Sequence, residues 1–234
     1  MIRCVAFDFD GTLVRSNLIK RRSFYDVVAD RPGAGDILDD LFASEFKGDR
    51  YEVFQELFQR LNPEWPPDQC RQEGRRLAIT YGELCQACIR SCDEVPGASE
   101  LLTELKRQSI NAYVVSATPE RDLLPIVRDR GYDHFFSGIF GRPKGKVEHL
   151  ENILARENIS SAELVMVGDG DDDRAAADAI KCGFIGIANT GNGSLRQADA
   201  MIEDLRPLLG LILNGPAEVS AETTIKVGEP NKNV

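Results

Sequence analysis

The sequence lacks three features that would each place it in a special class. Basic residues are scarce: 28 Lys and Arg stand against 38 Asp and Glu, a formal charge of −10, whereas a binder of nucleic acid or anionic membranes needs a basic face. The apolar run near the end, 208–213, is too short to span a bilayer. The N-terminus does not read as a secretory signal, because Asp8 and Asp10 interrupt it. We therefore expect a cytoplasmic protein that binds neither nucleic acid nor membranes.

The composition is that of an ordinary globular protein. The chain has 234 residues, 42% hydrophobic and 28% charged, enough for one large domain or two modest ones with a real core. Cys85, Cys88 and Cys92 are spaced i, i+3 and i+7 downstream of Cys70, which is compatible with a zinc site. Their spacing also continues an apolar helical face, and buried thiols behave as small hydrophobes. We predict core packing for these cysteines.

Residues 14–92 are predicted to be almost entirely helical. Apolar side chains recur at helical spacing in one stretch, at Val53, Phe54, Leu57, Phe58 and Leu61. Other helices are expected at 16–29, 37–46 and 68–91. We interpret 15–92 as one helical insertion.

Past residue 93 the pattern changes to strands that alternate with helices. Strands are expected at 112–115, 135–140, 164–167 and 184–188. Between them, Thr118 is expected to cap a helix that begins at Pro119, and 146–157 is expected to be helical. The alternation predicts an α/β fold, a doubly wound parallel sheet formed by 1–14 and 93–214 as a Rossmann-like core, with the α-helical insertion as a cap. The tail 215–234 has little apolar content and is expected to be disordered.

Two carboxylates end the first predicted strand. Asp8 and Asp10 follow the apolar run 4–7, and Gly11 then allows the chain to turn. Because alternate residues of a strand point the same way, both carboxylates are expected on one side. A fold tolerates their repulsion mainly where a divalent cation, a lysine or a shared proton lies between them.

Other polar residues are expected at the same edge of the sheet. Ser116 ends the second predicted strand, and Asp169 follows a later one. Ligands of open α/β sheets bind in the crevice beyond the carboxyl ends of the strands, so these groups are expected to converge there. Asp169 and Asp173 stand four apart where the chain enters a helix, and carboxylates are typical ligands of Mg²⁺.

A lysine is the expected counter-charge at this acidic edge. Lys146 opens a predicted helix, where the macrodipole disfavours a cation, so a local structural reason for it is weak. An ammonium there would offset the carboxylate repulsion and could hold an anionic substrate oxygen. Lys144 remains an alternative for the same role. The dipole alone explains Asp171 and Asp172, at the helix start.

Together these residues resemble the four signatures of the haloacid dehalogenase-like hydrolases. In chain order they are Asp8-Phe9-Asp10-Gly11-Thr12, Val115-Ser116, Lys146, and Gly168-Asp169 with Asp173. The resemblance covers about 1–14 and 93–204. The insertion resembles the helical cap that closes over the site in the phosphoglycolate phosphatase and phosphoglucomutase branches.

The resemblance implies a phosphatase that forms an aspartyl-phosphate. Asp8 would be the nucleophile. Asp10 would protonate the leaving oxygen and then activate water as a base. Ser116 and Lys146 would hold the phosphoryl oxygens. The presence of Asp10 favours phosphate esters, because family members that cleave carbon–halogen bonds lack this second aspartate.

The resemblance also implies a cofactor and a substrate class. Mg²⁺ would be held by Asp8, the main-chain carbonyl of Asp10, Asp169 and, in support, Asp173. Further substrate-binding positions would be Gly11, Thr12 and Ala117. The expected substrate is a small phosphorylated metabolite, since a capped site excludes bulk water and large substrates. We expect a monomer or a homodimer.

Three alternatives remain open. A phosphotransferase of the sugar-phosphate mutase type would return the phosphoryl group to a sugar and would need an activating sugar bisphosphate. A phospho-acceptor signalling domain shares the carboxylates, the hydroxyl residue and the lysine, but the large insertion and Asp10 argue against it. A catalytically silent binding protein is disfavoured because every expected catalytic position is filled.

Overall fold

The computed structural model describes residues 1–44, 46, 48–188 and 200–214. By their contacts the residues divide into two compact units, Met1–Arg15 with the chain from Cys92 onward, and Ser16–Ser91. Every residue predicted for the active site belongs to the first unit. The tail 215–234, expected to be disordered, lies outside the described residues.

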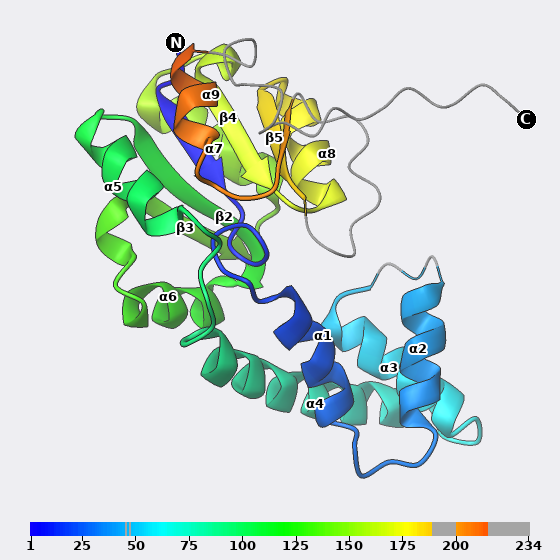
Figure 1. Ribbon diagram of the computed structural model, residues 1–234. Helices are drawn as coiled ribbons and strands as arrows, with labels where there is room; N and C mark the ends of the chain where they lie inside the picture. The colour runs from blue at the N-terminus through cyan, green and yellow to red at the C-terminus, as the bar shows by residue number, and fades with distance from the viewer. Residues whose placement is uncertain (45, 47, 189–199, 215–234) are drawn as a thin grey trace, which may run out of the picture. The chain divides into compact units, whose positions relative to one another are not determined.

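The first unit contains a parallel sheet of six strands. In chain order they are β1 (Cys4–Phe7), β2 (Asn111–Pro119), β3 (Phe136–Arg142), β4 (Leu164–Gly168), β5 (Gly183–Ile187) and β6 (Ala200–Ile202). Their order in space is β3-β2-β1-β4-β5-β6, and every neighbouring pair is parallel (Figure 1). From β1 the sheet extends through β2 to β3 on one side. The chain then returns, and β4, β5 and β6 extend the sheet on the other side of β1. This confirms the predicted doubly wound α/β fold and places the topological switch point beside β1.

Helices cover both faces of this sheet. They are α5 (Ala98–Arg107), α6 (Glu120–Asp129), α7 (Lys146–Glu157), α8 (Asp171–Ile180) and α9 (Leu208–Asn214), with 3₁₀ turns at Asp133–Phe135 and Ser161–Glu163. α7 packs on α8, and α5 packs on β2 and α9. Right-handed crossovers place α5 and α6 on one face, and α7 and α8 on the other.

The central strand β1 is apolar throughout because both of its faces are covered. All four of its residues are buried. Cys4 and Ala6 pack in a core cluster with Leu150 of α7 and residues of α8. Val5 and Phe7 point to the opposite face, by the alternation of a strand, and are fully buried as well. The first carboxylate of the chain therefore follows a rigid, doubly buried strand.

Two expectations about the end of β2 are wrong. β2 does not end near Ser116: it continues to Pro119, which is paired with Arg142 of β3. The helix that follows has Pro119 at its N-cap position and no side-chain cap, so Thr118 is a strand residue. The strand β6 and the helix α9 were not predicted. The apolar run that forms α9 served only as evidence against a membrane span.

The second unit is built from helices in its described part. These are α1 (Asn17–Asp26), α2 (Ala34–Ala43), α3 (Arg50–Leu61) and α4 (Pro67–Ile89). Asp49 and Glu52 form a capping box at the start of α3. The ring of Phe24 packs against Phe42, Phe54 and Tyr81, which joins all four helices into one core.

The cysteines of this region follow the core-packing prediction only in part. Cys70 and Cys85 are buried on α4, but Cys88 is exposed and Cys92 lies beyond the end of the helix. The buried face of α4 continues from Cys85 to Ile89, four residues on, and leaves Cys88 outside it. Among the described residues, no helix has the length and apolar content needed to cross a membrane.

Candidate active site

Asp8 and Asp10 lie in a tight turn at the carboxyl end of β1. The amide of Asp8 donates to the carbonyl of Val167 at 2.9 Å, which extends the pairing of β1 with β4. The amide of Leu13 then donates back to the carbonyl of Phe9 at 3.0 Å. Gly11 has a φ of 81°, a backbone conformation that favours glycine. The turn buries both carboxylates beyond the strand end, with Asp8 only 6% exposed.

Three buried carboxylates form a cluster at the switch point. One oxygen each of Asp8, Asp169 and Asp173 lies within 4.8 Å of the others. Asp173 is in the first turn of α8, where its Oδ2 accepts a hydrogen bond from the amide of Gly170 at 3.0 Å. The hydroxyl of Thr12 donates to Asp169 Oδ1 at 3.4 Å. β1, β4 and α8 thus bring together carboxylates from distant parts of the chain, as the sequence predicted.

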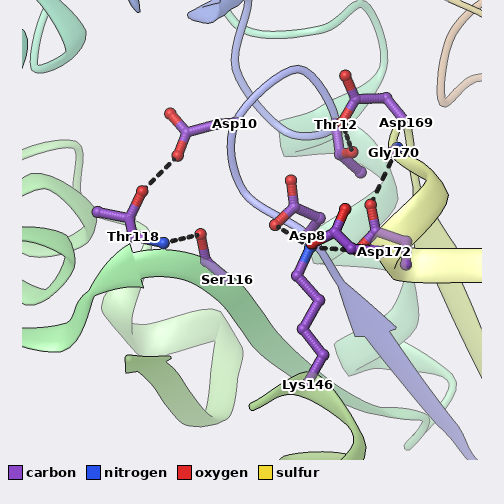
Figure 2. Close-up of polar contacts among 10 residues, drawn as sticks. Asp8, Asp10, Thr12, Ser116, Thr118, Lys146, Asp169, Gly170 and Asp172 are labelled. Carbon is purple, nitrogen blue, oxygen red and sulfur yellow. Dashed lines mark hydrogen bonds and ion pairs between the residues drawn. The ribbon is translucent and has the colours of Figure 1, made fainter. Parts of the chain in front are cut away.

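Lys146 supplies the positive charge of this cluster. Its Nζ lies 3.2 Å from Asp8 Oδ1, 2.5 Å from Asp173 Oδ1 and 2.9 Å from Asp172 Oδ2 (Figure 2). Its side chain is 9% exposed, whereas that of Lys144 is 54% exposed and pairs with Glu148 at 2.5 Å. Lys146 is the lysine that reaches the carboxylates, and Lys144 does not.

Asp172 is a member of this cluster that the sequence analysis missed. It was attributed to the helix dipole alone, yet its carboxylate touches the Lys146 ammonium. The signal in the sequence was three consecutive aspartates, Asp171 to Asp173, of which only the last was assigned to the site.

Burial and crowding shift the pKa values of the cluster. Burial, reinforced by the charges of Asp169 and Asp10 and opposed by Lys146, raises the pKa of Asp8 to about 6. Burial and the Asp8 charge also raise the pKa of Asp173. Burial alone would lower the pKa of Lys146, but the three neighbouring carboxylates raise it above its ordinary value. The site carries more negative charge than its lysine offsets.

Asp10 is turned away from the carboxylate cluster. Its Oδ2 accepts a hydrogen bond from the Thr118 hydroxyl at 2.8 Å. The amide of Thr118 in turn donates to the Ser116 hydroxyl oxygen at 3.1 Å. Figure 2 shows this group of Asp10, Thr118 and Ser116 beside the group around Asp8 and Lys146. The two aspartates of the opening motif therefore have separate partners.

The remaining predicted substrate-binding positions lie in the turn after β1 and near the end of β2. Gly11 and Thr12 are buried in the turn after Asp10. Ala117 lies between the two hydroxyl residues of β2 and is exposed, whereas Ser116 is 2% exposed. Thr118 was not predicted for the site. The alternation of two hydroxyl residues along a strand, at 116 and 118, was the available signal.

Comparisons with known proteins agree with this architecture. The chain is 27% identical over 223 residues to a phosphoglycolate phosphatase of Pectobacterium atrosepticum, which covers 89% of this chain and 93% of that protein. A Haemophilus somnus protein described as a predicted phosphoglycolate phosphatase has a structure that superposes with a TM-score of 0.72 at 21% identity, over 90% of this chain and 97% of that one.

A further solved structure shares the fold. The haloacid dehalogenase-type hydrolase YfnB of Bacillus subtilis, bound to magnesium, superposes with a TM-score of 0.67 at 18% identity, over 90% of this chain and 98% of that one. The family model for haloacid dehalogenase-like hydrolases matches residues 2–180. The chain belongs to the haloacid dehalogenase-like hydrolase family.

Proposed function

We propose that this protein is a Mg²⁺-dependent phosphatase that hydrolyses a small phosphorylated metabolite through an aspartyl-phosphate on Asp8. The observation that carries the proposal is the different placement of two aspartates that are separated by one residue. Asp8 lies in a buried cluster with Lys146, and Asp10 lies apart on a hydroxyl. This separation suits a nucleophile and an acid–base group that act on opposite sides of one phosphorus atom.

The carboxylate cluster fits a hard divalent cation. Asp8, Asp169 and Asp173 offer oxygen ligands, and together they carry more negative charge than the single positive charge of Lys146 offsets. We propose that they hold Mg²⁺, with the main-chain carbonyl of Asp10 as a further ligand. When bound, Mg²⁺ would neutralise charge on the phosphoryl oxygens. It would also lower the pKa of Asp8 and keep that carboxylate ionised.

The residues of the chain divide the remaining work. An Asp8 carboxylate oxygen forms a bond to phosphorus as the ester oxygen leaves, and Asp10 gives that oxygen a proton. Asp10 then takes a proton from water, whose oxygen forms the new bond to phosphorus while the bond to Asp8 breaks. The products are an alcohol and inorganic phosphate. Ser116 and Lys146 hold the phosphoryl oxygens, with main-chain groups at Gly11, Thr12 and Ala117 in support.

The substrate is proposed from the relatives. Phosphoglycolate phosphatases are similar to this chain over most of its length, so 2-phosphoglycolate is the first substrate to test. The role of residues 16–91 as a cap, the cytoplasmic location and the monomeric or dimeric state stay predictions.

Purified protein should be assayed for phosphate release from a panel of small phosphomonoesters, with Mg²⁺ and with EDTA. We expect repeated turnover that requires Mg²⁺. Lys146→Met should lose most of the activity, because it removes the ammonium from the cluster. Lys144→Met should keep it, because the ion pair of Lys144 in the described part of the chain is with Glu148, outside the cluster. These two lysines are a matched pair.

Three outcomes would contradict the proposal. Turnover that requires a sugar bisphosphate would indicate a phosphotransferase. Release of one phosphate per chain would indicate a phospho-acceptor. Absence of any phosphate release, with Mg²⁺ present and the whole panel tested, would indicate a binding protein.

A further inference from the structure

We propose that Thr118 is a positioning residue for Asp10 and that its hydroxyl fixes the orientation of the Asp10 carboxyl group toward the leaving oxygen. This inference rests on the proposed function, in which Asp10 is the acid–base group. Thr118 donates its hydroxyl hydrogen to Asp10 Oδ2 at 2.8 Å. This hydrogen bond ties Oδ2 to β2 and so holds the Asp10 carboxyl group in one orientation.

The backbone of Thr118 is held in a fixed place by the sheet. Thr118 is a residue of β2, and Pro119 after it is paired with Arg142 of β3. The neighbouring backbone is so close that a Cβ on Gly141 would lie 2.4 Å from the Thr118 carbonyl oxygen. A hydroxyl group on such an element can orient a partner more accurately than one on a loose loop.

Thr118 also links the acid–base group to the phosphoryl-binding hydroxyl. Ser116 and Thr118 both lie in the stretch of β2 between Val115 and Pro119, where the pairing register with β3 shifts. The Thr118 amide donates to the Ser116 oxygen at 3.1 Å, which orients the Ser116 hydroxyl so that its hydrogen can be donated to a phosphoryl oxygen. One strand end would thereby align both the phosphoryl group and the proton donor.

The step that depends on this orientation is departure of the alcohol. As the ester P–O bond breaks and the bond from Asp8 to phosphorus forms, the proton of the Asp10 carboxyl group moves to the leaving oxygen. An alkoxide leaves poorly without that proton, whereas p-nitrophenolate leaves readily. Loss of the Thr118 hydroxyl should therefore slow hydrolysis of alkyl phosphates more than that of p-nitrophenyl phosphate.

The test compares Thr118→Val, which keeps the shape and removes the donor, with Thr118→Ser, which keeps the donor. We expect Thr118→Val to lower kcat on 2-phosphoglycolate by about 10- to 100-fold, with a much smaller loss on p-nitrophenyl phosphate. Thr118→Ser should retain most of the wild-type rate on both. Thr118→Ala serves as a second donor-free variant if the valine is not accommodated, and circular dichroism checks the fold of each.

A double-mutant cycle shows whether Thr118 acts through Asp10. In an Asp10→Asn background, Thr118→Val should cause no further loss, because no proton remains to be positioned. Equal losses on the two substrates, or a full additional loss in the Asp10→Asn background, would overturn the assignment while leaving the phosphatase proposal intact. Absence of phosphate release by the wild-type protein would overturn both.

Discussion

The sheet has a cluster of carboxylates at the carboxyl ends of its strands (the carboxyl edge) and a single carboxylate, Glu157, at their amino ends (the amino edge), and the two are satisfied in different ways. At the amino edge, the Glu157 carboxylate accepts hydrogen bonds from neutral donors, the Tyr113 hydroxyl and the Asn111 amide, the latter at 2.7 Å. At the carboxyl edge, the buried carboxylates of Asp8, Asp169 and Asp173 lie close together, and a single ammonium, that of Lys146, pairs with Asp8 and Asp173. α7 joins the two edges, since Lys146 is its first residue and Glu157 its last.

The difference separates a structural polar cluster from a functional one. A carboxylate with enough neutral donors is stabilised where it lies and needs no ligand. A cluster with surplus buried charge is costly to the fold unless a cation or a proton joins it. Substitutions at the amino edge should therefore reduce stability and spare activity, and substitutions at the carboxyl edge should do the reverse.

The largest expected effect is on activity, at Asp8. Asp8→Asn removes the proposed nucleophile but keeps the size of the side chain, so phosphate release should fall below detection while the circular dichroism spectrum is unchanged. Turnover at a measurable fraction of the wild-type rate would show that another group attacks phosphorus.

The next largest effect sharpens the contrast between Asp8 and Asp10. Asp10→Asn should reduce kcat on alkyl phosphates by ~10²–10⁴-fold, the usual worth of general acid–base catalysis. The reduction on p-nitrophenyl phosphate should be smaller, and a kinetic series of leaving groups measures the difference. A uniform loss across the series would remove Asp10 as the proton donor.

The third prediction concerns stability: the Asp8→Asn substitution that abolishes activity should stabilise the metal-free protein. The pKa of Asp8 is raised to about 6 from 3.8, so the folded, metal-free protein binds the proton more tightly than the unfolded chain. The contribution of Asp8 to the stability of the metal-free protein should therefore fall as the pH rises from about 4 through about 6, by about 3 kcal/mol. Asp8→Asn lacks this loss and should be the more stable protein in EDTA at about pH 7.5.

Thermal unfolding in EDTA measures this difference. The advantage of Asp8→Asn should shrink as the pH falls below about 6 and should nearly vanish only below about pH 4, where Asp8 is protonated in the folded and the unfolded chain alike. Added Mg²⁺ should stabilise the wild type more than the variant, because it binds the folded state of the complete cluster. A variant that is less stable than the wild type in EDTA at about pH 7.5 would contradict the idea of surplus charge.

The smallest effect is expected at the amino edge. Tyr113→Phe removes one donor from Glu157 and should cost about 1.5–3 kcal/mol in urea unfolding, as for hydrogen bonds to charged groups, with kcat unchanged. Tyr25→Phe is the matched control, because its hydroxyl bonds Asp39 at an exposed site and should cost less. A large loss of activity in Tyr113→Phe would contradict the proposal that the amino edge of the sheet is structural and the carboxyl edge functional.

The central features of the site could be predicted because each has a local signal. A buried strand that ends in carboxylates, a lysine at a helix start and an acidic run after an apolar strand are all visible in sequence. The expected bounds of β1 and the start of α7 at Lys146 match the structure, and β4 begins at Leu164 as expected and ends one residue later than expected.

The features that were missed depend on partners far away in the chain. Thr118 followed by Pro119 has the local pattern of a helix cap, but pairing with β3 draws it into the sheet, and its hydroxyl bonds Asp10, 108 residues away. Cys88 is spaced as if it belonged to the buried face of α4, but that face contains Cys85 and Ile89 and leaves Cys88 exposed. Tertiary pairing decides such cases, and the local pattern alone does not.

The position of β1 has a consequence for synthesis of the chain. It is the central strand, paired with β2 and β4, which begin only at Asn111 and Leu164. The helices of residues 16–91 make local contacts and can form early on the ribosome, whereas β1 must wait for partners that emerge much later. Until Lys146, Asp169 and Asp173 have emerged, a nascent chain thus carries Asp8 without the lysine and carboxylates that would make it a nucleophile.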